Sequence, residues 1–263
     1  MGARERTVGQ VSLASFPAAD LAHIHEYAPM SVFRGKHIFL TGATGWFGQW
    51  LQFALTESRI STLAERDFPD TIEPIDFLIH AAPSQTRETL DFAHRHGCKR
   101  ALFISSGAVY ARDDAYANAK RRDEAICKAH ALKPVIARCF TFVGPGQKLG
   151  AHWAVGNFLA DAIAGRTIKV KGDGSAIRSY MHMADLVVAL LAILADGEGA
   201  HDVGSPEPVS IEDLALKIGD MAGVAAVIEG KPSEPDYYVP NNTAPVRIGL
   251  DDALRRTYAW LKQ

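Results

Sequence analysis

Short apolar runs alternate with longer amphipathic stretches from residue 36 onward, and this alternation predicts the main elements of the fold. The first run, KHIFLTG at 36–42, is apolar and ends in glycine, which is typical of a buried strand. The next stretch, GATGWFGQWLQFALTES, places Trp46, Trp50 and Phe53 on one side of a helix. By the same reasoning we expect strands at 60–64, 77–80, 101–104 and 135–137, and helices at 88–96, 116–131 and 156–164. Strands that alternate with helices predict a parallel sheet covered on both faces.

The same pattern divides the chain into three parts. Residues 1–35 form an N-terminal extension with one short predicted helix, Asp20–Tyr27, to which we assign no chemistry. Residues 36–148 carry the strand–helix alternation and predict an α/β domain with a doubly wound, Rossmann-type sheet. Residues 149–263 are richer in glycine and proline, and we expect a small C-terminal substrate-binding lobe there. This lobe would be interleaved with the last strand of the main sheet, near Ala200–Val203.

Composition narrows the class of protein. The chain has 263 residues, 48% of them hydrophobic and 22% charged, which is enough apolar material for a sizeable core. Its 28 basic and 30 acidic residues are well mixed, and this argues against nucleic-acid and membrane partners. The three cysteines, Cys98, Cys127 and Cys139, lack metal-ligand spacing and are expected to be reduced thiols, with no metal site. The first 16 residues hold no apolar stretch of signal-peptide length, so a cytoplasmic location is expected.

A glycine-rich turn follows the first predicted strand and opens the first long helix. Its sequence, TGATGWFG at 41–48, has the spacing G-x-x-G-x-x-G. Glycines let the backbone approach a pyrophosphate, and a helix N-terminus offers N–H groups and a positive dipole end. The alternative is a tight strand–helix connection without a ligand. The predicted dinucleotide contacts are Gly42, Thr44, Gly45, Trp46, Phe47 and Gly48, together with Ala81 and Ala82 at the end of the 77–80 strand. The side chains of Trp46 and Phe47 themselves favour the core.

The group that would bind the adenosine ribose lies at the end of the second predicted strand. Glu65 there favours NAD, because a carboxylate accepts hydrogen bonds from the ribose hydroxyls. Arg66 would instead suit the 2′-phosphate of NADP. A solvated charge cluster that includes Asp67 is the third interpretation. We favour NAD, with NADP as the alternative.

A tyrosine and a lysine at helical spacing form the candidate catalytic pair. Tyr116 and Lys120, in YANAK, lie at i and i+4 and share one face of the predicted helix. A positive charge close to a phenol favours its ionised form, which suits proton transfer near neutral pH. The alternative is a solvent-facing pair. Ser105 and Ser106 end the 101–104 strand, at the edge of the sheet where ligands bind.

In sum, these motifs make the chain resemble the extended short-chain dehydrogenase/reductases, in particular the NAD-dependent nucleotide-sugar epimerase/dehydratase group. The resemblance covers most of the chain, and the motifs occur in the order of that family. They are TGATGWFG (41–48), IHAA (79–82), SSGAVY (105–110), YANAK (116–120), ARCFTFVGPGQ (137–147) and KGDGSAIRSYMHMADL (171–186).

The resemblance implies a role for each matching position. Ser106 would bond the reacting sugar oxygen, Tyr116 would be the acid/base, and Lys120 would hold the nicotinamide ribose. Arg178 would clamp the substrate diphosphate, for which its planar fork is suited, and Asn157 would contact the substrate. The alternative for Arg178 is a surface salt bridge with no role in substrate binding. His80, His182 and Asp185 are expected to be structural.

The resemblance also excludes two kinds of chemistry. The 4,6-dehydratases of the family carry an acidic pair directly after the catalytic Ser/Thr, where this chain has Gly107 and Ala108. The fucose-synthase type has a cysteine where this chain has Ala108. Hydride chemistry remains, and we expect an NAD-dependent nucleotide-sugar 4-epimerase, with a 4-ketosugar reductase as the alternative. A Rossmann protein that binds without turnover is the third hypothesis, and a homodimer through the 88–96 and 116–131 helices is implied by analogy.

Four connections are shorter than the family pattern predicts, near 67–75, 84–86, 110–116 and 243–251. Either mobile segments are missing at these places or the protein is a compact variant. The enzyme hypothesis requires the phenol of Tyr116 to meet Ser106 beside the 42–48 turn despite the short connection between them.

Overall fold

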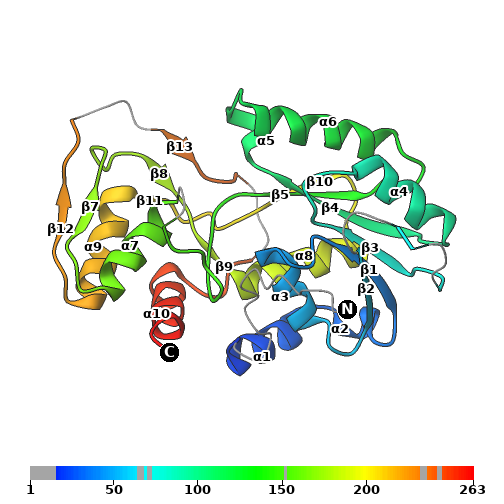
Figure 1. The fold of residues 1–263 in the computed structure, drawn as a ribbon, viewed down its shortest axis with the longest axis horizontal. Helices are drawn as coiled ribbons and strands as arrows, with labels where there is room; N and C mark the ends of the chain where they lie inside the picture. Colours follow the sequence, from blue (N-terminus) through cyan, green and yellow to red (C-terminus); the bar gives the residue numbers. More distant parts are fainter. Residues whose placement is uncertain (1–15, 64–67, 70–72, 151–152, 232–235, 242–244) are drawn as a thin grey trace, which may run out of the picture.

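A six-stranded parallel sheet forms the centre of the molecule (Figure 1). The computed structural model describes residues 16–63, 68–69, 73–150, 153–231, 236–241 and 245–263. The strand order is β10-β5-β4-β3-β1-β2. The strands are β1 (His37–Thr41), β2 (Arg59–Thr62), β3 (Phe77–His80), β4 (Arg100–Ser106), β5 (Val135–Cys139) and β10 (Ala200–Val203). The predicted doubly wound α/β fold is therefore confirmed.

Helices cover both faces of this sheet, as Figure 1 shows. Helices α4 (Thr86–Arg95), α5 (Ala108–Ala111) and α6 (Ala115–Ala129) lie on one side. Helices α3 (Trp46–Ala54), α8 (Met183–Asp196) and α1 (Ala18–Tyr27) lie on the other, followed in the N-terminal region by the short α2 (Met30–Phe33). Successive strand residues point to opposite faces: in β4, Leu102 and Ile104 pack toward α8, whereas Ala101 and Phe103 pack toward α4 and α6.

The remaining elements form a smaller body beside the carboxyl ends of the strands. Its helices are α7 (Ala154–Ile163), α9 (Ile211–Ala222) and α10 (Leu250–Leu261). Its strands are β6 (Phe142–Val143), β7 (Ile168–Val170), β8 (Ile177–Arg178), β9 (Met181–His182), β11 (Val209–Ser210), β12 (Ala226–Ile228) and β13 (Tyr237–Tyr238). Strands β11, β8 and β13 make a three-stranded sheet, in which Tyr238 is the register partner of Arg178.

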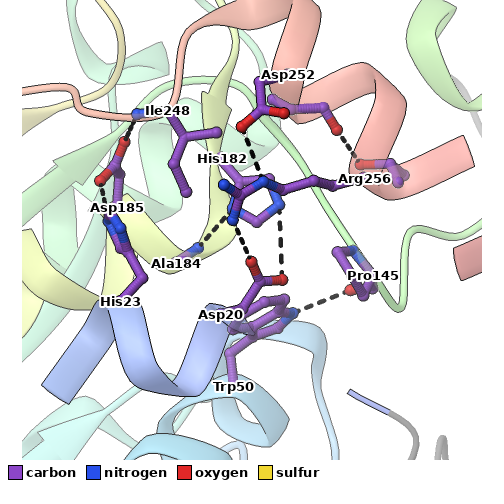
Figure 2. Close-up of polar contacts among 12 residues, drawn as sticks. Asp20, His23, Trp50, Pro145, His182, Ala184, Asp185, Ile248, Asp252 and Arg256 are labelled. Carbon is purple, nitrogen blue, oxygen red and sulfur yellow. Dashed lines mark hydrogen bonds and ion pairs between the residues drawn. The ribbon is translucent and has the colours of Figure 1, made fainter. Parts of the chain in front are cut away.

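A buried polar cluster joins the N-terminal helix to the C-terminal one (Figure 2). Asp20 on α1 is fully buried and accepts a 2.8 Å hydrogen bond from Arg256 on α10. His182 lies between them, with its Nε2 3.9 Å from the Asp20 carboxylate and its Nδ1 accepting from the Ala184 N–H. His23 bonds Asp185 at 2.8 Å, and Asp185 also accepts the Ile248 N–H. His182 and Asp185 thus make their polar contacts within the protein, as expected of structural residues.

The described residues agree with several other expectations. Helices α1, α4, α6 and α7 each begin and end within two residues of the predicted bounds. All three cysteines are buried, free thiols. Among the described helices, none combines the length and the apolar character that a membrane span requires.

Candidate active site

The glycine turn passes directly over the end of the neighbouring strand. Gly42 has φ +71°, and a Cβ added there would lie 2.6 Å from the carbonyl carbon of Ala81. A Cβ on Gly48 would lie 2.3 Å from the Gly42 carbonyl oxygen. Neither position has room for a side chain. Gly45 is the N-cap of α3 and has no side chain with which to cap the first N–H groups of the helix. The turn therefore offers the backbone cradle that a pyrophosphate requires.

The bulky residues of this turn hold it in place from the protein side. The indole N–H groups of Trp46 and Trp50 both donate to the Pro145 carbonyl, at 2.7 and 2.9 Å. The ring of Phe47 packs edge-on against Phe142, with centroids 5.5 Å apart. These side chains fix the start of α3, which leaves the backbone of the turn to face a ligand. The side chain of Thr44 is exposed.

Strand β3 ends beside the turn in a buried hydrogen-bonded histidine. The Nδ1 of His80 lies 2.6 Å from the Thr41 hydroxyl, and its Nε2 lies 3.1 Å from the Thr86 hydroxyl. Burial, together with the nearby charge of Lys120, lowers the pKa of His80 to about 3. His80 is therefore neutral, and its two hydrogen bonds connect β3 to the end of β1 and to the start of α4. The backbone of Ala81 and Ala82, which follow it, lies directly against Gly42 of the turn.

The residues predicted to bind the adenosine ribose, Glu65 and Arg66, lie outside the described residues, as does Asp67. The choice of NAD over NADP remains a prediction from the sequence.

The catalytic candidates lie on α6 and at the carboxyl end of the neighbouring strand β4. Ser106 is its last residue, 8% exposed, and its Oγ accepts the Ala108 N–H at 3.2 Å. Tyr116 lies in the first turn of α6 with 52% of its surface exposed. Burial raises the pKa of Tyr238 on β13, and Ser106 and Tyr116 are both near enough to influence it.

Lys120 is held one turn further along α6. Its Nζ donates to the Ile104 carbonyl at 2.8 Å and lies 4.9 Å from the centre of the Phe103 ring. Burial lowers the pKa of this ammonium group. The lysine is anchored to β4, and two of its three N–H donors remain for other acceptors.

The two predicted substrate contacts lie in the smaller body. Arg178 bonds Asp236, with 2.5 Å between Nη2 and Oδ2, and also donates from Nη1 to the Asp236 carbonyl. This ion pair matches the alternative in which Arg178 has only a structural role. To bind Arg178, a substrate diphosphate would have to replace the carboxylate of Asp236. Asn157 is half-buried on α7, where no hydrogen bond of its side chain to another described residue is found.

Sequence reasoning missed a polar network under the site. Glu124 accepts the Ser105 hydroxyl at 2.7 Å and both ends of the Arg138 guanidinium, at 2.9 and 2.6 Å. Arg138 also donates to the Tyr110 hydroxyl, which donates to Asp202. The signal was present, because Glu124 follows Lys120 by four residues and extends the same helical face.

A pocket of about 160 Å³ opens beside Gly107, the residue after Ser106, between the sheet and the smaller body. It is lined by Gly107, Tyr110, Phe140, Asp202, Tyr237, Tyr238, Val239 and Asn241. A Cβ on Gly107 would lie 2.7 Å from the Phe140 ring, so a side chain at 107 would require that ring to shift.

The sequence of the chain is similar to those of several characterised enzymes. The UDP-glucuronic acid decarboxylase 1 of Arabidopsis thaliana is 34% identical over 38% of the chain, and this match spans only 23% of that protein. The UDP-N-acetyl-alpha-D-glucosaminuronate decarboxylase of Bacillus cytotoxicus is 26% identical over 73% of each chain. A dTDP-4-dehydro-6-deoxy-D-allose reductase of a Streptomyces species is 29% identical over 54% of this chain and 50% of that protein.

The fold has solved counterparts as well. The enzyme WbmF of Bordetella bronchiseptica, crystallised with NADH, superposes with a TM-score of 0.71 at 21% identity, covering 88% of this chain and 93% of that one. The family model described as the NAD dependent epimerase/dehydratase family matches residues 60–204, more than half of the chain. The chain therefore belongs to the NAD-dependent epimerase/dehydratase family.

Proposed function

We propose that this protein is an NAD-dependent nucleotide-sugar 4-epimerase that works by hydride transfer at sugar C4. The cofactor fits the cradle at Gly42 and Gly48, where added Cβ atoms would collide with backbone, and its pyrophosphate would lie at the N-terminus of α3. The nicotinamide ring supplies the hydride acceptor when the cofactor is bound. Ser106 ends β4, which lies two strands from β1 in the sheet, and Tyr116 lies on α6, which packs against β4. Both would be within the reach of an extended dinucleotide.

The protein residues would then divide the work. Tyr116 accepts the proton of the C4 hydroxyl as the hydride leaves C4, and Ser106 aligns that oxygen. Lys120, anchored to the Ile104 carbonyl, directs its remaining N–H donors to the nicotinamide ribose. Arg178 holds the substrate diphosphate after exchanging Asp236 for it. Return of the hydride to the other face of the ketone completes epimerisation.

The two residues directly after Ser106 support this choice of reaction. Elimination of water from the sugar needs an acid and a base close to Ser106. Residues 107 and 108 are glycine and alanine, so neither position directly after Ser106 supplies a carboxylate. This supports hydride chemistry without elimination.

A 4-ketosugar reductase is the second candidate, and the Streptomyces reductase among the relatives favours it. The two functions differ in how they use the cofactor. An epimerase regenerates NAD in each cycle and benefits from retaining it, whereas a reductase must exchange it.

The experiment is to purify the protein, identify any retained nicotinamide cofactor, and test UDP-, dTDP-, GDP- and CDP-sugars with NAD and NADP. Retained NAD and interconversion of C4 epimers are expected. A protein that is purified without nucleotide and oxidises added NADPH with a 4-ketosugar is the reductase. Release of carbon dioxide from UDP-glucuronic acid would instead indicate the activity for which the Arabidopsis relative is named. Failure to bind any nicotinamide dinucleotide would contradict both proposals.

A further inference from the structure

The pocket beside Gly107 combines aromatic walls with one charged side chain. The ring of Phe140 packs against Tyr238 with centroids 4.8 Å apart and stacks on Tyr110 at 6.5 Å. Of the eight described residues that line the pocket, Asp202 alone carries a formal charge at neutral pH. The volume of the pocket is about 160 Å³, and an apolar cavity of about 150 Å³ accommodates benzene. The pocket is therefore large enough for part or all of one six-membered ring.

A chain of hydrogen bonds holds the Asp202 carboxylate in place. The Tyr110 hydroxyl donates to Oδ1 of Asp202 at 2.9 Å and accepts from Nη1 of Arg138 at 2.6 Å. The Arg138 guanidinium is fixed in turn by Glu124, to which it donates at 2.9 and 2.6 Å. The orientation of Asp202 is thus set within the protein, and a ligand that bonds to it does not have to order this side chain first.

The second oxygen of Asp202 and its negative charge are available to a ligand. Among the described residues, no hydrogen bond to Oδ2 and no ion pair of Asp202 is found. The positive charge of Arg138 is already paired with Glu124, at 2.6 Å. A carboxylate accepts hydrogen bonds and cannot donate them. The pocket therefore favours a ligand group that donates a hydrogen bond, and it repels a second carboxylate.

The position of the pocket shows which part of a sugar would enter it. Gly107, in its wall, directly follows Ser106, which would align the C4 oxygen in the proposed function. In a pyranose, C6 is attached to C5 and lies two bonds from C4. A hexose carries a hydroxymethyl group there, which donates a hydrogen bond, whereas a hexuronate carries a carboxylate. The two classes of sugar thus differ at the atom closest to the pocket.

We propose that Asp202 is a specificity-determining residue: its second carboxylate oxygen accepts a hydrogen bond from the C6 hydroxyl of the sugar, and its charge repels a carboxylate at that position. The inference rests on the proposed function and names the substrate class of the site. The substrate is a nucleotide-linked hexose with a hydroxyl at C6, and nucleotide-linked hexuronates are excluded by charge.

The test measures binding of UDP-glucose and UDP-glucuronic acid, which differ only at C6, by isothermal titration calorimetry with saturating NADH. The wild type should bind UDP-glucose at least about tenfold more tightly, since like charges repel at short range. Asp202→Asn should bring the two affinities within about threefold of each other, by strengthening the binding of UDP-glucuronic acid. The matched control is Asp220→Asn, which removes the same charge from an exposed residue of α9 outside the pocket and should behave as wild type.

A second variant, Tyr110→Phe, separates the charge of Asp202 from its orientation. It removes the hydroxyl that holds Oδ1 but keeps the carboxylate, so it should weaken binding of UDP-glucose and still disfavour UDP-glucuronic acid. Equal wild-type affinities for the two sugars, a preference for UDP-glucuronic acid, or a preference for UDP-glucose that persists in Asp202→Asn would each overturn the proposal. If the panel above selects another nucleotide, its hexose and hexuronate replace the UDP pair. A wild type that binds no nucleotide sugar refutes the proposed function itself, which is a distinct outcome.

Discussion

Tyr116 combines an exposed position with the central role in the proposed chemistry, so its substitution separates catalysis from stability. Tyr116→Phe should lower kcat by about 10²- to 10⁴-fold, the range for loss of a general acid/base. Because the side chain is half exposed, the melting temperature should change little. Steady-state kinetics and NADH titration check this, with the exposed Tyr27→Phe as a control. Activity near wild type in Tyr116→Phe would assign the proton transfer to another group.

Gly48 tests the cofactor cradle in a similar way. An added methyl group would lie 2.3 Å from the Gly42 carbonyl oxygen, so Gly48→Ala must displace the turn. We expect NADH affinity to fall by at least about tenfold, measured by isothermal titration calorimetry. Gly172→Ala is the matched control, because a Cβ there meets nothing within 4 Å. Equal affinities of the two variants would exclude the turn as the pyrophosphate site.

The site residues that could be predicted from the sequence are those that belong to contiguous motifs. The strand that ends in Ser106 and the helix that carries Tyr116 could be recognised from local pattern alone. Tyr238 could not, since β13 has only two residues and tertiary packing brings it to the pocket that Gly107 also lines. Glu124 could have been recognised from its helical spacing, but its partner Arg138 lies on another strand.

Among the elements, α6 depends on Glu124 for its attachment to β4 and β5. The pair of Glu124 with Arg138 is largely buried, with side-chain exposures of 5% and 18%. Glu124→Gln should destabilise the fold by about 2–4 kcal/mol, because it leaves the guanidinium without its counter-charge. Urea unfolding measures this, and the exposed Glu88→Gln serves as the control. A loss below about 0.5 kcal/mol would show that the pair adds nothing beyond packing.

The same pair predicts a pH dependence. Burial would raise the pKa of Glu124, but the hydrogen bonds from Arg138 and Ser105 outweigh it, and the pKa falls below its ordinary value of 4.5. A carboxyl with a lowered folded pKa stabilises the protein above its unfolded pKa, and this stabilisation is lost as pH falls through the folded value. The stability difference between wild type and Glu124→Gln should therefore shrink below about pH 4.5, as unfolding curves at several pH values would show. A difference independent of pH would contradict the role of the charge.

The strands of the main sheet and the helices between them were predicted from their pattern, whereas helices α9 and α10 were not, although both are amphipathic. Helix α8 was not predicted, because MADLVVALLAILAD is apolar on every side and shows no amphipathic stripe. Its burial against the sheet on one side and α1 and α3 on the other explains that composition. The short strands of the smaller body, two or three residues each, are below the length at which alternation can be recognised.

For the molecule as a whole, the cluster in Figure 2 joins the N-terminal helix to the C-terminal one. Burial raises the pKa of Asp20, and the hydrogen bond from Arg256 limits that rise. Arg256→Ala should lower stability by about 2–4 kcal/mol at pH 7, since it leaves a buried carboxylate unpaired. The exposed Arg255→Ala is the matched control. A group whose folded pKa is raised favours the folded state at low pH, so the penalty of Arg256→Ala should decrease toward pH 4. An equal penalty at both pH values would contradict this account.

The indole of Trp46 is held rigidly by Pro145 at the very start of α3, directly after the turn proposed to bind the dinucleotide. Such a fixed fluorophore next to a bound NADH would pass its excitation energy to the reduced nicotinamide. Occupancy of the protein would then be visible in its own emission spectrum, as quenching of the indole band with sensitised nicotinamide light. The intrinsic fluorescence of the protein would thus report whether its bound cofactor is reduced, without an added dye.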